Sequence, residues 1–282
     1  MNPRVSVVVP SYNSVEFIDE TLRSILGQSY ADFELLISDH SSSDGTWERI
    51  KEYEGDPRVR IMRVAAGGGA LRNWSAVTMQ ARGELIKLVC GDDLLFRDGL
   101  AQQVAAFDRY PDAVLVAAQR DILDQRGRVL VAGRGLQGLD GLVPGKDAIR
   151  RTVRSGTNVF GEPVCMMARR EILVASGGWD ARSPYLIDQA TCARVLLNGP
   201  MVAIRRPLAG FRINPGQWSV ALAKEQAVHA REFHRTLSEA NPGLLTTGDV
   251  RIGDLRATAM AFARRSTYSL LEWRARLGTR RR

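Results

Sequence analysis

The sequence predicts an α/β fold built around a mostly parallel, doubly wound sheet. Short apolar runs with the pattern of buried strands alternate with stretches of helical periodicity through the first third of the chain. These runs are nearly continuous in apolar residues, which is typical of parallel strands covered on both faces. With 282 residues, 45% of them hydrophobic, the chain can form one large domain or a domain with an appendage.

The first part of the chain contains strand and helix patterns in strict alternation. The expected strands cover residues 4–9, 33–37, 59–64 and 85–89. The expected helices lie between them, over residues 15–26, around Trp47 and Ile50, and from Arg72 to Val77. Right-handed crossovers then bring the carboxyl ends of these strands to one edge of the sheet.

The second part of the chain is less regular. The expected helices cover residues 100–110, 148–153 and 187–197, and the expected strands cover 113–118, 164–168 and 202–213. A hairpin over 122–131 is expected to turn at Gln125-Arg126-Gly127, residues 133–145 to form a glycine-rich loop, and 177–180 to form a turn. From residue 219 onward the composition shifts to Ala, Arg and Leu, which predicts two or three helices.

Polar residues follow three of the first four strands. They are Tyr12, Asp39 and the adjacent pair Asp92-Asp93. Open α/β sheets bind their ligands in the crevice at the carboxyl ends of the strands, which is where these side chains are expected. Two neighbouring carboxylates repel each other, so a nearby cation would relieve the pair, although a turn or a helix N-cap also accounts for it.

Several kinds of site are disfavoured by the sequence. No Gly-x-Gly-x-x-Gly motif and no lysine-containing phosphate loop follows the first strand, so we expect neither a dinucleotide oxidoreductase nor a P-loop enzyme. The glycines at 67–69 fit a phosphate-binding turn and a plain flexible turn equally well. His229 and His234 are about 140° apart around a helix, so they are not expected to share a metal ion.

The positive charge is concentrated at the C-terminus. The net charge is +8 and the isoelectric point about 9.8, but nine arginines fall between residues 251 and 282 against only Asp254 and Glu272. The rest of the chain is nearly neutral, so we expect no nucleic-acid partner. Residues 268–282 have the pattern of an amphipathic basic helix, which either packs on the domain or lies on an anionic membrane; peripheral membrane contact through 251–282 is thus one of two alternatives.

The sequence predicts neither membrane insertion nor secretion. No stretch approaches the roughly 18 to 20 apolar residues that a transmembrane helix needs, and the N-terminus lacks a small-residue cleavage site. Cys90, Cys165 and Cys192 are widely spaced and frame neither disulfides nor a zinc site. We therefore expect a cytoplasmic protein, at most associated with the inner face of the membrane.

A series of short motifs follows in a specific order along residues 4–219. They are Val7-Val8-Val9-Pro10-Ser11-Tyr12-Asn13, Asp39-x-x-Ser42-x-Asp44-Gly45-Thr46, Arg72-Asn73, Ala81-x-Gly83-Glu84-x-Ile86, Asp92-Asp93-x-Leu95, Gly177-Gly178-Trp179-Asp180 and the segments around Asp188 and Arg212. In order and spacing they resemble the large family of inverting glycosyltransferases that use nucleotide-sugars on a GT-A fold. The resemblance implies a Rossmann-like, three-layer α/β/α domain over residues 1–218, with a nucleotide-binding half to about residue 98 and an acceptor half over 99–218, followed by a basic helical extension over 219–282.

The resemblance also implies a reaction. It is the metal-assisted transfer of a single sugar, with inversion, from a UDP-, GDP- or dTDP-sugar to a hydroxyl of a glycan or lipid-linked acceptor in cell-surface polysaccharide biosynthesis. A divalent cation, Mn²⁺ or Mg²⁺, stabilises the departing diphosphate in such a reaction. Asp92 matches the metal-binding aspartate, with Asp93 in support, and Asp188 matches the carboxylate that removes the acceptor proton.

Further residues match the binding sites of the family. The implied nucleotide-sugar site comprises Pro10, Tyr12, Asn13, Asp39, Arg72, Asp92, Asp93 and Arg212. In it, Tyr12 lies against the base, Asp39 holds base or ribose, Arg72 meets base or phosphates, and Arg212 lies near the diphosphate. The implied acceptor site comprises Glu162, Trp179, Asp180 and Trp218. Asp180 is an alternative base, although an aspartate in this setting commonly caps a helix.

Three positions depart from the pattern of the family. Cys90 replaces the first aspartate of the metal motif, His40 replaces an acid near the base, and Asn214 replaces a histidine that contributes to the metal site. The first change leaves Asp92 intact, the second puts uridine specificity in question, and the third weakens the expected metal affinity. A non-catalytic glycan- or nucleotide-binding module is therefore an alternative. A nucleotidyltransferase is a second one, disfavoured because no glycine- and lysine-rich loop follows the first strand.

Overall fold

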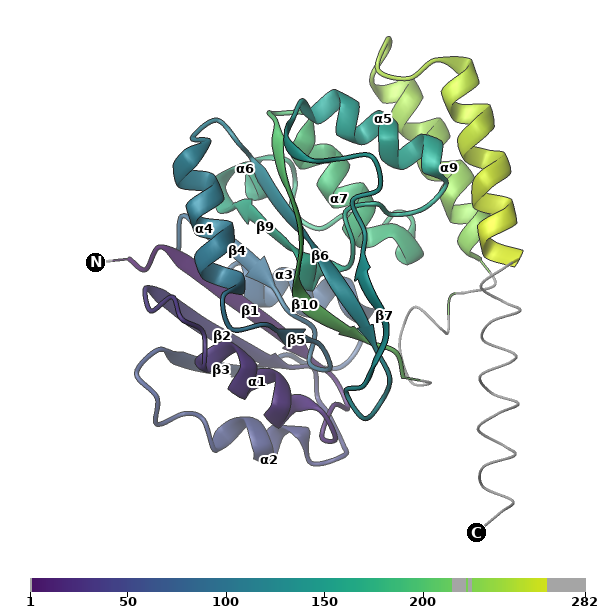
Figure 1. Cartoon of the computed structure of the whole chain (residues 1–282). Coiled ribbons are helices and arrows are strands. Elements are labelled where there is room, and N and C mark those ends of the chain that lie inside the picture. Colours follow the sequence, from purple (N-terminus) through teal and green to yellow (C-terminus); the bar gives the residue numbers. More distant parts are fainter. Residues whose placement is uncertain (1, 215–221, 223–224, 263–282) are drawn as a thin grey trace.

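The computed structural model describes residues 2–214, 222 and 225–262 (Figure 1). Ten strands of this part join one sheet: β1 Val5–Ser11, β2 Phe33–Asp39, β3 Val59–Arg63, β4 Leu85–Leu88, β5 Leu94–Leu95, β6 Leu115–Leu123, β7 Val129–Arg134, β8 Gly141–Val143, β9 Met166–Arg169 and β10 Met201–Arg212. The helices are α1 Ile18–Leu26, α2 Thr46–Lys51, α3 Gly69–Thr78, α4 Gly99–Arg109, α5 Gly145–Ser155, α6 Arg170–Ala175, α7 Ile187–Leu196 and α9 Gln226–Ala240, with 3₁₀ turns η1 Pro163–Cys165 and η2 Pro184–Leu186. A further helix covers residues 247–262.

The sheet consists of a parallel part and a mixed part. β3, β2, β1 and β4 are neighbours in that order and are all parallel. β9 then runs antiparallel to both β4 and β6, and β6 pairs in parallel with β10. The short strands β5 and β8 pair antiparallel with β10, and β7 pairs antiparallel with β6. The predicted α/β class with a mostly parallel sheet is confirmed.

Helices cover both faces of the sheet. In the view of Figure 1, α1 and α4 lie in front of the strands and α3 lies behind them. Every residue of β1 and of β2 is buried, as expected for parallel strands inside a three-layer fold. α1 contributes Ile18, Leu22 and Ile25, spaced by three and four residues, so its apolar face lies against the sheet while its other face meets solvent.

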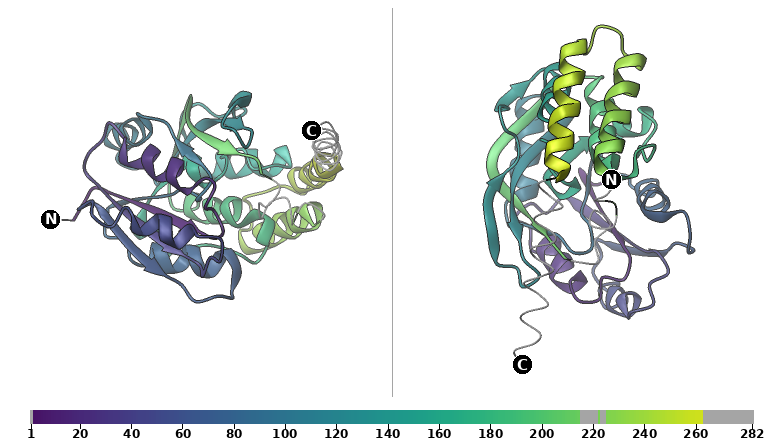
Figure 2. Two further views of the ribbon diagram at one scale, coloured as in Figure 1. Left: turned by 90° about the horizontal axis from the view of Figure 1, so that it is seen from below. Right: turned by 90° about the vertical axis from the view of Figure 1, so that its right-hand side faces the viewer.

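Two C-terminal helices pack along one side of the molecule. The right-hand view of Figure 2 shows α9 and helix 247–262 side by side, and Arg231 on one donates to Thr258 on the other. Phe233, Leu237 and Ala257 are buried in the same apolar cluster as the sheet. Helices were predicted here, and the division of the chain at residue 218 stays a prediction, as does the helix over 268–282, which lies outside the described residues.

Other segments differ in part from the sequence predictions. The hairpin is confirmed, with β6 and β7 joined through Asp124, whose carbonyl accepts from the Gly127 amide at 3.0 Å. The predicted loop over 133–145 is wrong at residues 141–143, because β8 pairs with β10 there. Neither β5 nor the one-and-a-half-turn helix α6 was predicted, since each is too short to show a periodic pattern.

Within the described residues, no helix is both long and apolar enough to cross a membrane.

Candidate active site

The first strands meet at the point where the strand order reverses. β1 lies between β2 and β4, and the chain leaves all three at the same edge of the sheet. Ser11 pairs with Asp39 in the sheet register, and a Cβ added at Gly91 would come within 3.1 Å of the Ser11 and Ser14 hydroxyl oxygens. The predicted gathering of these strand ends at one edge is therefore present, and a side chain at residue 91 would be tightly packed against Ser11 and Ser14.

One side of this edge is an open shelf that carries aromatic and polar side chains. Tyr12 is 61% exposed, and its ring meets that of His40 edge-on at 6.0 Å. His40 is fixed by a 2.9 Å contact between its Nε2 atom and the Gly67 carbonyl. Arg72, at the start of α3, is exposed and donates to the Ala66 carbonyl at 3.3 Å. The shelf offers an aromatic face and an arginine that a ligand can reach.

Asn13 and Pro10 shape the end of β1 beneath this shelf. Pro10 is buried within β1. The backbone amide of Asn13 donates to the Ser42 hydroxyl at 2.9 Å, and its side-chain oxygen accepts from the Ser43 amide at 3.0 Å. Asn13 has a φ of 46°, a left-handed conformation that asparagine tolerates better than most residues. These contacts bind the loop after β1 to the loop after β2.

Asp39 is buried at the end of β2. One carboxylate oxygen, Oδ2, accepts from the Ser42 amide at 3.2 Å and from Arg63 Nε at 3.1 Å. The other oxygen, Oδ1, has no hydrogen-bond partner among the described residues. Asp39 thus has one fixed oxygen and one oxygen with unused hydrogen-bonding capacity next to the shelf.

Asp92 and Asp93 occupy different surroundings although they are adjacent. Asp92 is half-buried, and its Oδ2 atom accepts from the Asn214 amide at 2.7 Å. Asp93 is buried, its Oδ1 atom accepts from the Arg212 backbone amide at 3.2 Å, and its Oδ2 atom has no partner among the described residues. Burial, together with the Asp92 charge, raises the pKa of Asp93 well above its usual value. The protonated form of Asp93 is therefore favoured more than in an ordinary aspartate, which reduces the repulsion between the two neighbouring carboxyls.

The guanidinium of Arg212 is enclosed by protein atoms. It donates to the Asp92 carbonyl at 2.9 Å, to the Gln125 carbonyl at 2.8 Å and to Glu20 Oε2 at 2.5 Å. Its central carbon, Cζ, lies 4.9 Å from the centre of the Phe17 ring. In this arrangement Arg212 holds β10, the β6–β7 turn and α1 around the acidic pair.

Asp188 lies in the first turn of α7, among residues from several elements. Its Oδ2 atom accepts from the Asn158 amide at 2.9 Å, and its Oδ1 atom accepts from the Gln189 backbone amide at 2.8 Å. Burial raises the pKa of Asp188 to about 6, and the nearby charge of Glu162 contributes, although the two hydrogen bonds oppose the shift. A carboxyl with such a pKa is mostly ionised at neutral pH yet is a better proton acceptor than an ordinary aspartate.

Cys90 is half-buried and lies two residues before Asp92 in the chain. Besides burial, the charges of Asp92, Asp93, Asp188 and Glu162 all raise the pKa of the Cys90 thiol. The thiol is therefore neutral at physiological pH. Each of these four carboxyls therefore lies close enough to the Cys90 thiol to act on it.

The remaining residues of the implied acceptor site have structural contacts. Asp180 is buried and pairs with Arg182 at 2.6 Å and Arg194 at 3.5 Å; burial raises its pKa, but hydrogen bonds from Arg182 outweigh this and lower it overall. Trp179 donates from its indole nitrogen to Thr78 at 2.8 Å. These contacts favour Asp188 over Asp180 as a base. Trp218 lies outside the described residues.

A metal ion at this site would have few protein ligands. Among the described residues there is no group of three or more His, Cys, Asp or Glu side chains that could hold one. After β4, Asp92 offers a half-buried carboxylate with the Asn214 amide beside it. This donor set suits Mg²⁺ or a similar hard cation that takes one carboxylate and completes its coordination with phosphate oxygens and water.

Sequence reasoning missed three polar residues near the site, of which Arg120 and Lys87 are buried and Asn158 is half-buried. Asn158 contacts Asp188, and Arg120 forms an ion pair with Glu162, but neither position carries a motif. Lys87, inside β4, donates to Gln103 Oε1 at 2.9 Å and to the Val164 carbonyl at 2.6 Å. A lysine in the middle of an apolar strand pattern was a visible signal for a buried polar contact.

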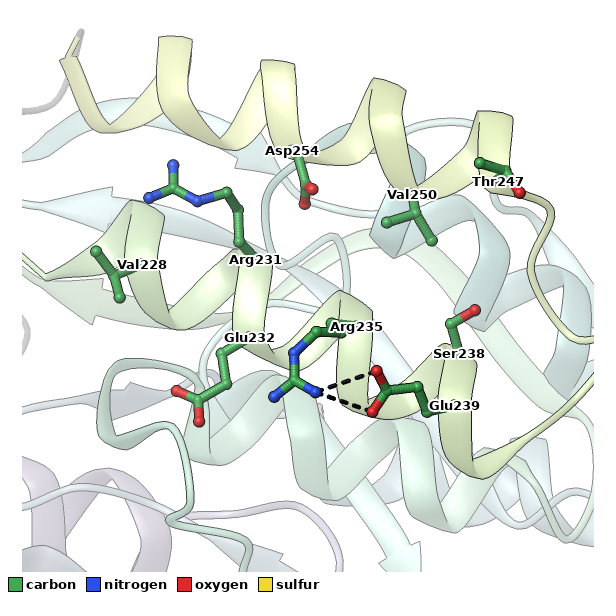
Figure 3. Close-up of a pocket in the computed structure, with 9 residues that line it drawn as sticks. All are labelled: Val228, Arg231, Glu232, Arg235, Ser238, Glu239, Thr247, Val250 and Asp254. Atoms are coloured by element: carbon green, nitrogen blue, oxygen red, sulfur yellow. Dashed lines mark hydrogen bonds and ion pairs between the residues drawn. The ribbon is translucent and has the colours of Figure 1, made fainter.

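A separate groove lies away from the strand ends. Figure 3 shows it between α9 and helix 247–262, lined by side chains that include Val228, Arg231 and Val250. Arg235 and Glu239 pair with each other along α9 at 2.9 Å. The groove shares no residue with the acidic site, so we do not assign the chemistry to it.

Solved structures with the same fold place this chain in a known class. It is similar to Staphylococcus aureus TarS in complex with UDP-GlcNAc, with a TM-score of 0.69, 19% identity, and 90% of this chain and 70% of that chain covered. It is also similar to the mannosyltransferase PcManGT from Pyrobaculum calidifontis in complex with GDP-Man and Mn²⁺, with a TM-score of 0.63, 20% identity, and 98% and 81% covered. The fold is thus of the GT-A type, with an acidic site at the carboxyl ends of its parallel strands.

The sequence comparisons identify the family. The model of glycosyl transferase family 2 matches residues 6–175, and the chain belongs to this family. Relatives include the uncharacterized protein MT1568 of Mycobacterium tuberculosis, 30% identical over 73% of this chain and 66% of its own length. The Escherichia coli glucosyltransferase WfgD, which acts on α-D-GlcNAc-diphosphoundecaprenol, is 32% identical over 36% of this chain and 40% of its own length. The chain spans less than two thirds of the length of each of these relatives.

Proposed function

We propose that this protein is an inverting glycosyltransferase that moves one sugar from a nucleoside diphospho-sugar to a hydroxyl group. The observation that carries the proposal is the half-buried Asp188 carboxyl, whose pKa is raised to about 6 and whose charge acts on the same Cys90 thiol as the strand-tip acid Asp92. Such a transfer needs a base that accepts the proton of the acceptor hydroxyl. It also needs a carboxylate that can bind a cation next to the departing diphosphate.

Asp188 is the general base of the proposed reaction. It accepts the proton of the acceptor hydroxyl while the acceptor oxygen forms a bond to the anomeric carbon. The bond between that carbon and the diphosphate oxygen breaks, and the electron pair leaves with the nucleoside diphosphate. Asn158 and the Gln189 amide orient the two carboxylate oxygens of Asp188 and so fix the direction from which the acceptor approaches.

Asp92 is the proposed ligand of a divalent cation. When bound, Mn²⁺ or Mg²⁺ would neutralise charge on the departing diphosphate. The proposal is supported by the ionised Asp92 carboxylate and by the Mn²⁺ named with the similar structure PcManGT. The Asn214 side-chain amide donates to Asp92 Oδ2, and the raised pKa of Asp93 favours its neutral form.

The nucleotide binds on the shelf at the ends of β1 and β2. Tyr12 stacks on the base, since its ring is exposed and held at its edge by His40. Asp39 accepts from base or ribose, and Arg72 contacts base or phosphates, as its guanidinium is free to reach solvent. Arg212 contributes indirectly, because its hydrogen bonds to Asp93 and to the Asp92 carbonyl hold the acidic pair in place. UDP-, GDP- and dTDP-sugars are the proposed donors.

A glycan or lipid-linked sugar of the cell surface is the proposed acceptor. WfgD acts on a sugar linked to diphosphoundecaprenol, and TuaG of Bacillus subtilis, 33% identical over 36% of this chain, is named for teichuronic acid biosynthesis. Glu162 lies beside Asp188 and is a proposed contributor to the acceptor side.

A donor panel with a matched variant tests this function. The protein with Mn²⁺ is incubated with UDP-, GDP- and dTDP-sugars, and sugar transfer or slow donor hydrolysis is measured. We expect one donor to be consumed, and Asp188→Asn to lower the rate at least 100-fold while donor affinity stays within a few-fold. An exposed control, Asp32→Asn, should match the wild type.

Two outcomes would contradict the proposal. Asp188→Asn with the full transfer rate would show that another group removes the proton. A protein that binds a nucleotide-sugar but consumes none of the panel, with or without added glycan acceptors, would favour a binding module.

A further inference from the structure

The proposed base is connected to a buried arginine through a single loop. In the loop 158–162, the Asn158 amide donates to Asp188 Oδ2 at 2.9 Å and to the Gly161 carbonyl at 2.7 Å. The next residue, Glu162, forms an ion pair with Arg120 of β6, with 2.5 Å between Arg120 Nε and Glu162 Oε2. A second contact joins Arg120 Nη2 to Glu162 Oε1 at 2.8 Å. The loop is thus tied to Asp188 at one end and to Arg120 at the other.

The guanidinium of Arg120 sits in a closed slot. Arg120 is 5% exposed and also donates from Nη1 to the Arg134 carbonyl at 3.1 Å. A Cβ added at Gly135 would come within 2.7 Å of Nη1, and one at Gly161 within 3.4 Å, so the backbone closes around the group. A guanidinium enclosed in this way cannot reach a substrate, and its charge acts on the groups next to it.

Titratable groups of the described residues on several elements interact electrostatically with Asp188. The Glu162 charge raises the pKa of Asp188, and the Asp188 charge in turn raises the pKa of Arg120, Cys90 and Cys192. Glu162 comes from the loop before η1, Arg120 from β6, Cys90 from the segment after β4, and Cys192 from α7. Burial raises the pKa of both thiols, so both are neutral. The electrostatic balance at Asp188 is therefore between the negative Glu162 and the positive Arg120, which lie in contact with each other.

We propose that Arg120 is a positioning residue for the base: it holds Glu162 and the loop 158–162 in place and offsets the charge that Glu162 exerts on Asp188. The catalytic role of Arg120 rests on the proposed function of Asp188. The contacts of Arg120 with Glu162, and their opposing charges near Asp188, do not depend on that function. Loss of Arg120 would leave Glu162 partly buried without its counter-charge. Ionisation of Asp188 would then be harder.

A carboxyl titration tests the charge balance without any need for transfer activity. The protein carrying ¹³C-labelled aspartate carboxyls is titrated by NMR, and the Asp188 signal is assigned by its absence in Asp188→Asn. We expect Arg120→Gln to raise the titration midpoint of Asp188 by about one pH unit and Glu162→Gln to lower it by a similar amount. The double variant Arg120→Gln/Glu162→Gln should return close to the wild type, because both charges are removed.

Conservative and remote variants complete the design. Arg120→Lys keeps the charge and should keep the midpoint within a few tenths of a pH unit, and Arg235→Gln, in an exposed pair on α9, should leave it unchanged. If Arg120→Gln does not fold, the other two variants test the proposal. The Asp188 midpoint should fall in Glu162→Gln and stay at the wild-type value in Arg120→Lys. An Asp188 midpoint that stays constant in Glu162→Gln overturns the proposal.

The pH profile of transfer separates positioning from general structural support. If Asp188 is the base, the acid limb of kcat/KM shifts in the same direction as the NMR midpoint in each variant. A merely structural Arg120 would lower transfer by one factor at every pH. If the NMR midpoints shift while no variant and no wild-type protein transfers sugar, the charge balance stands and the proposed function fails.

Discussion

Asp93 is buried and Asp188 is half-buried, and their surroundings raise the pKa of the two carboxyls in different ways. Asp93 lies beside the charged Asp92 and receives one backbone hydrogen bond, so its pKa is raised well above the usual value. Asp188 receives hydrogen bonds from Asn158 and from the Gln189 amide, which stabilise its ionised form and limit the rise to about 6. A carboxyl with a pKa of about 6 can exchange a proton near neutral pH, which is what a general base requires.

The pH dependence of transfer follows from this value. A base must be deprotonated to act, and the raised pKa of Asp188 means that the carboxyl is protonated below about pH 6. We expect kcat/KM to rise with pH, tenfold per unit, below pH 6 and to level off above it. A profile that is flat between pH 5 and pH 7.5, measured at a saturating cation concentration, would remove Asp188 from this role.

Asp92 is expected to control cation-dependent binding of the nucleoside diphosphate. Asp92→Ala removes the proposed cation ligand and should weaken binding in the presence of Mn²⁺ at least tenfold, about 1.4 kcal/mol. Isothermal titration calorimetry measures this, with and without chelator. In the chelated sample the variant and the wild type should bind alike, and Asp32→Ala is the surface control. Equal affinities with Mn²⁺ present would place the cation elsewhere.

At the scale of the elements, the parallel half of the sheet was predictable because its signals are local. Residues 33–37 form an apolar run, and Phe33–Asp39 is buried at every position. The edge strand β8 gives no such signal, since its three residues lie in a glycine-rich stretch and are stabilised by pairing with β10. The pairing of Arg120 with Glu162 is likewise invisible in the sequence, because it depends on how β6 packs against the loop before η1.

Lys87 couples three elements, and its replacement should reduce stability in a pH-dependent way. Its Nζ atom donates to Gln103 in α4 and to the carbonyls of Val164 and Met166, in η1 and β9. Lys87→Met leaves these buried acceptors without a donor, which costs about 1–3 kcal/mol for such a group.

The sign of the pH effect follows from linkage. Burial lowers the pKa of Lys87 to about 7, so between pH 7 and the unfolded value of about 10.5 the unfolded chain binds more protons than the folded one. The wild type therefore gains stability relative to Lys87→Met as the pH rises through this range. Urea unfolding at pH 7 and pH 9 measures the difference, with the exposed Lys51→Met as control. A difference that shrinks at pH 9 would mean that Lys87 is charged in the folded protein.

At the scale of the whole molecule, the site lies where the two parts of the sheet meet. β1, β2 and β4 bring Tyr12, Asp39 and Asp92 to one edge, whereas Asp188 arrives from α7, nearly a hundred residues later in the chain. Motif order in the sequence indicated that these residues belong together. The sequence did not indicate what fixes Asp188, because Asn158 and Arg120 act through packing of the second part of the sheet.

The C-terminal helices are expected to stabilise the domain that contains the sheet. Phe233, Leu237 and Ala257 are buried in the main apolar cluster, and Asp249, at the start of helix 247–262, accepts from Arg150 and Arg154 of α5 at 2.8 and 2.5 Å. A chain truncated after residue 224 loses all of these contacts. Fully burying a Phe or Leu side chain stabilises by about 1.5–3 kcal/mol, so the loss should exceed about 3 kcal/mol.

Urea unfolding of two truncated chains tests this contribution. A chain that ends at residue 262 keeps every described contact of α9 and helix 247–262, and it should retain most of the wild-type stability. The chain that ends at residue 224 should unfold at a clearly lower urea concentration with a smaller m value, because less surface is exposed on unfolding. If both truncated chains unfold at the same midpoint as the full chain, the helices form a separate unit, and the predicted division of the chain at residue 218 would gain support.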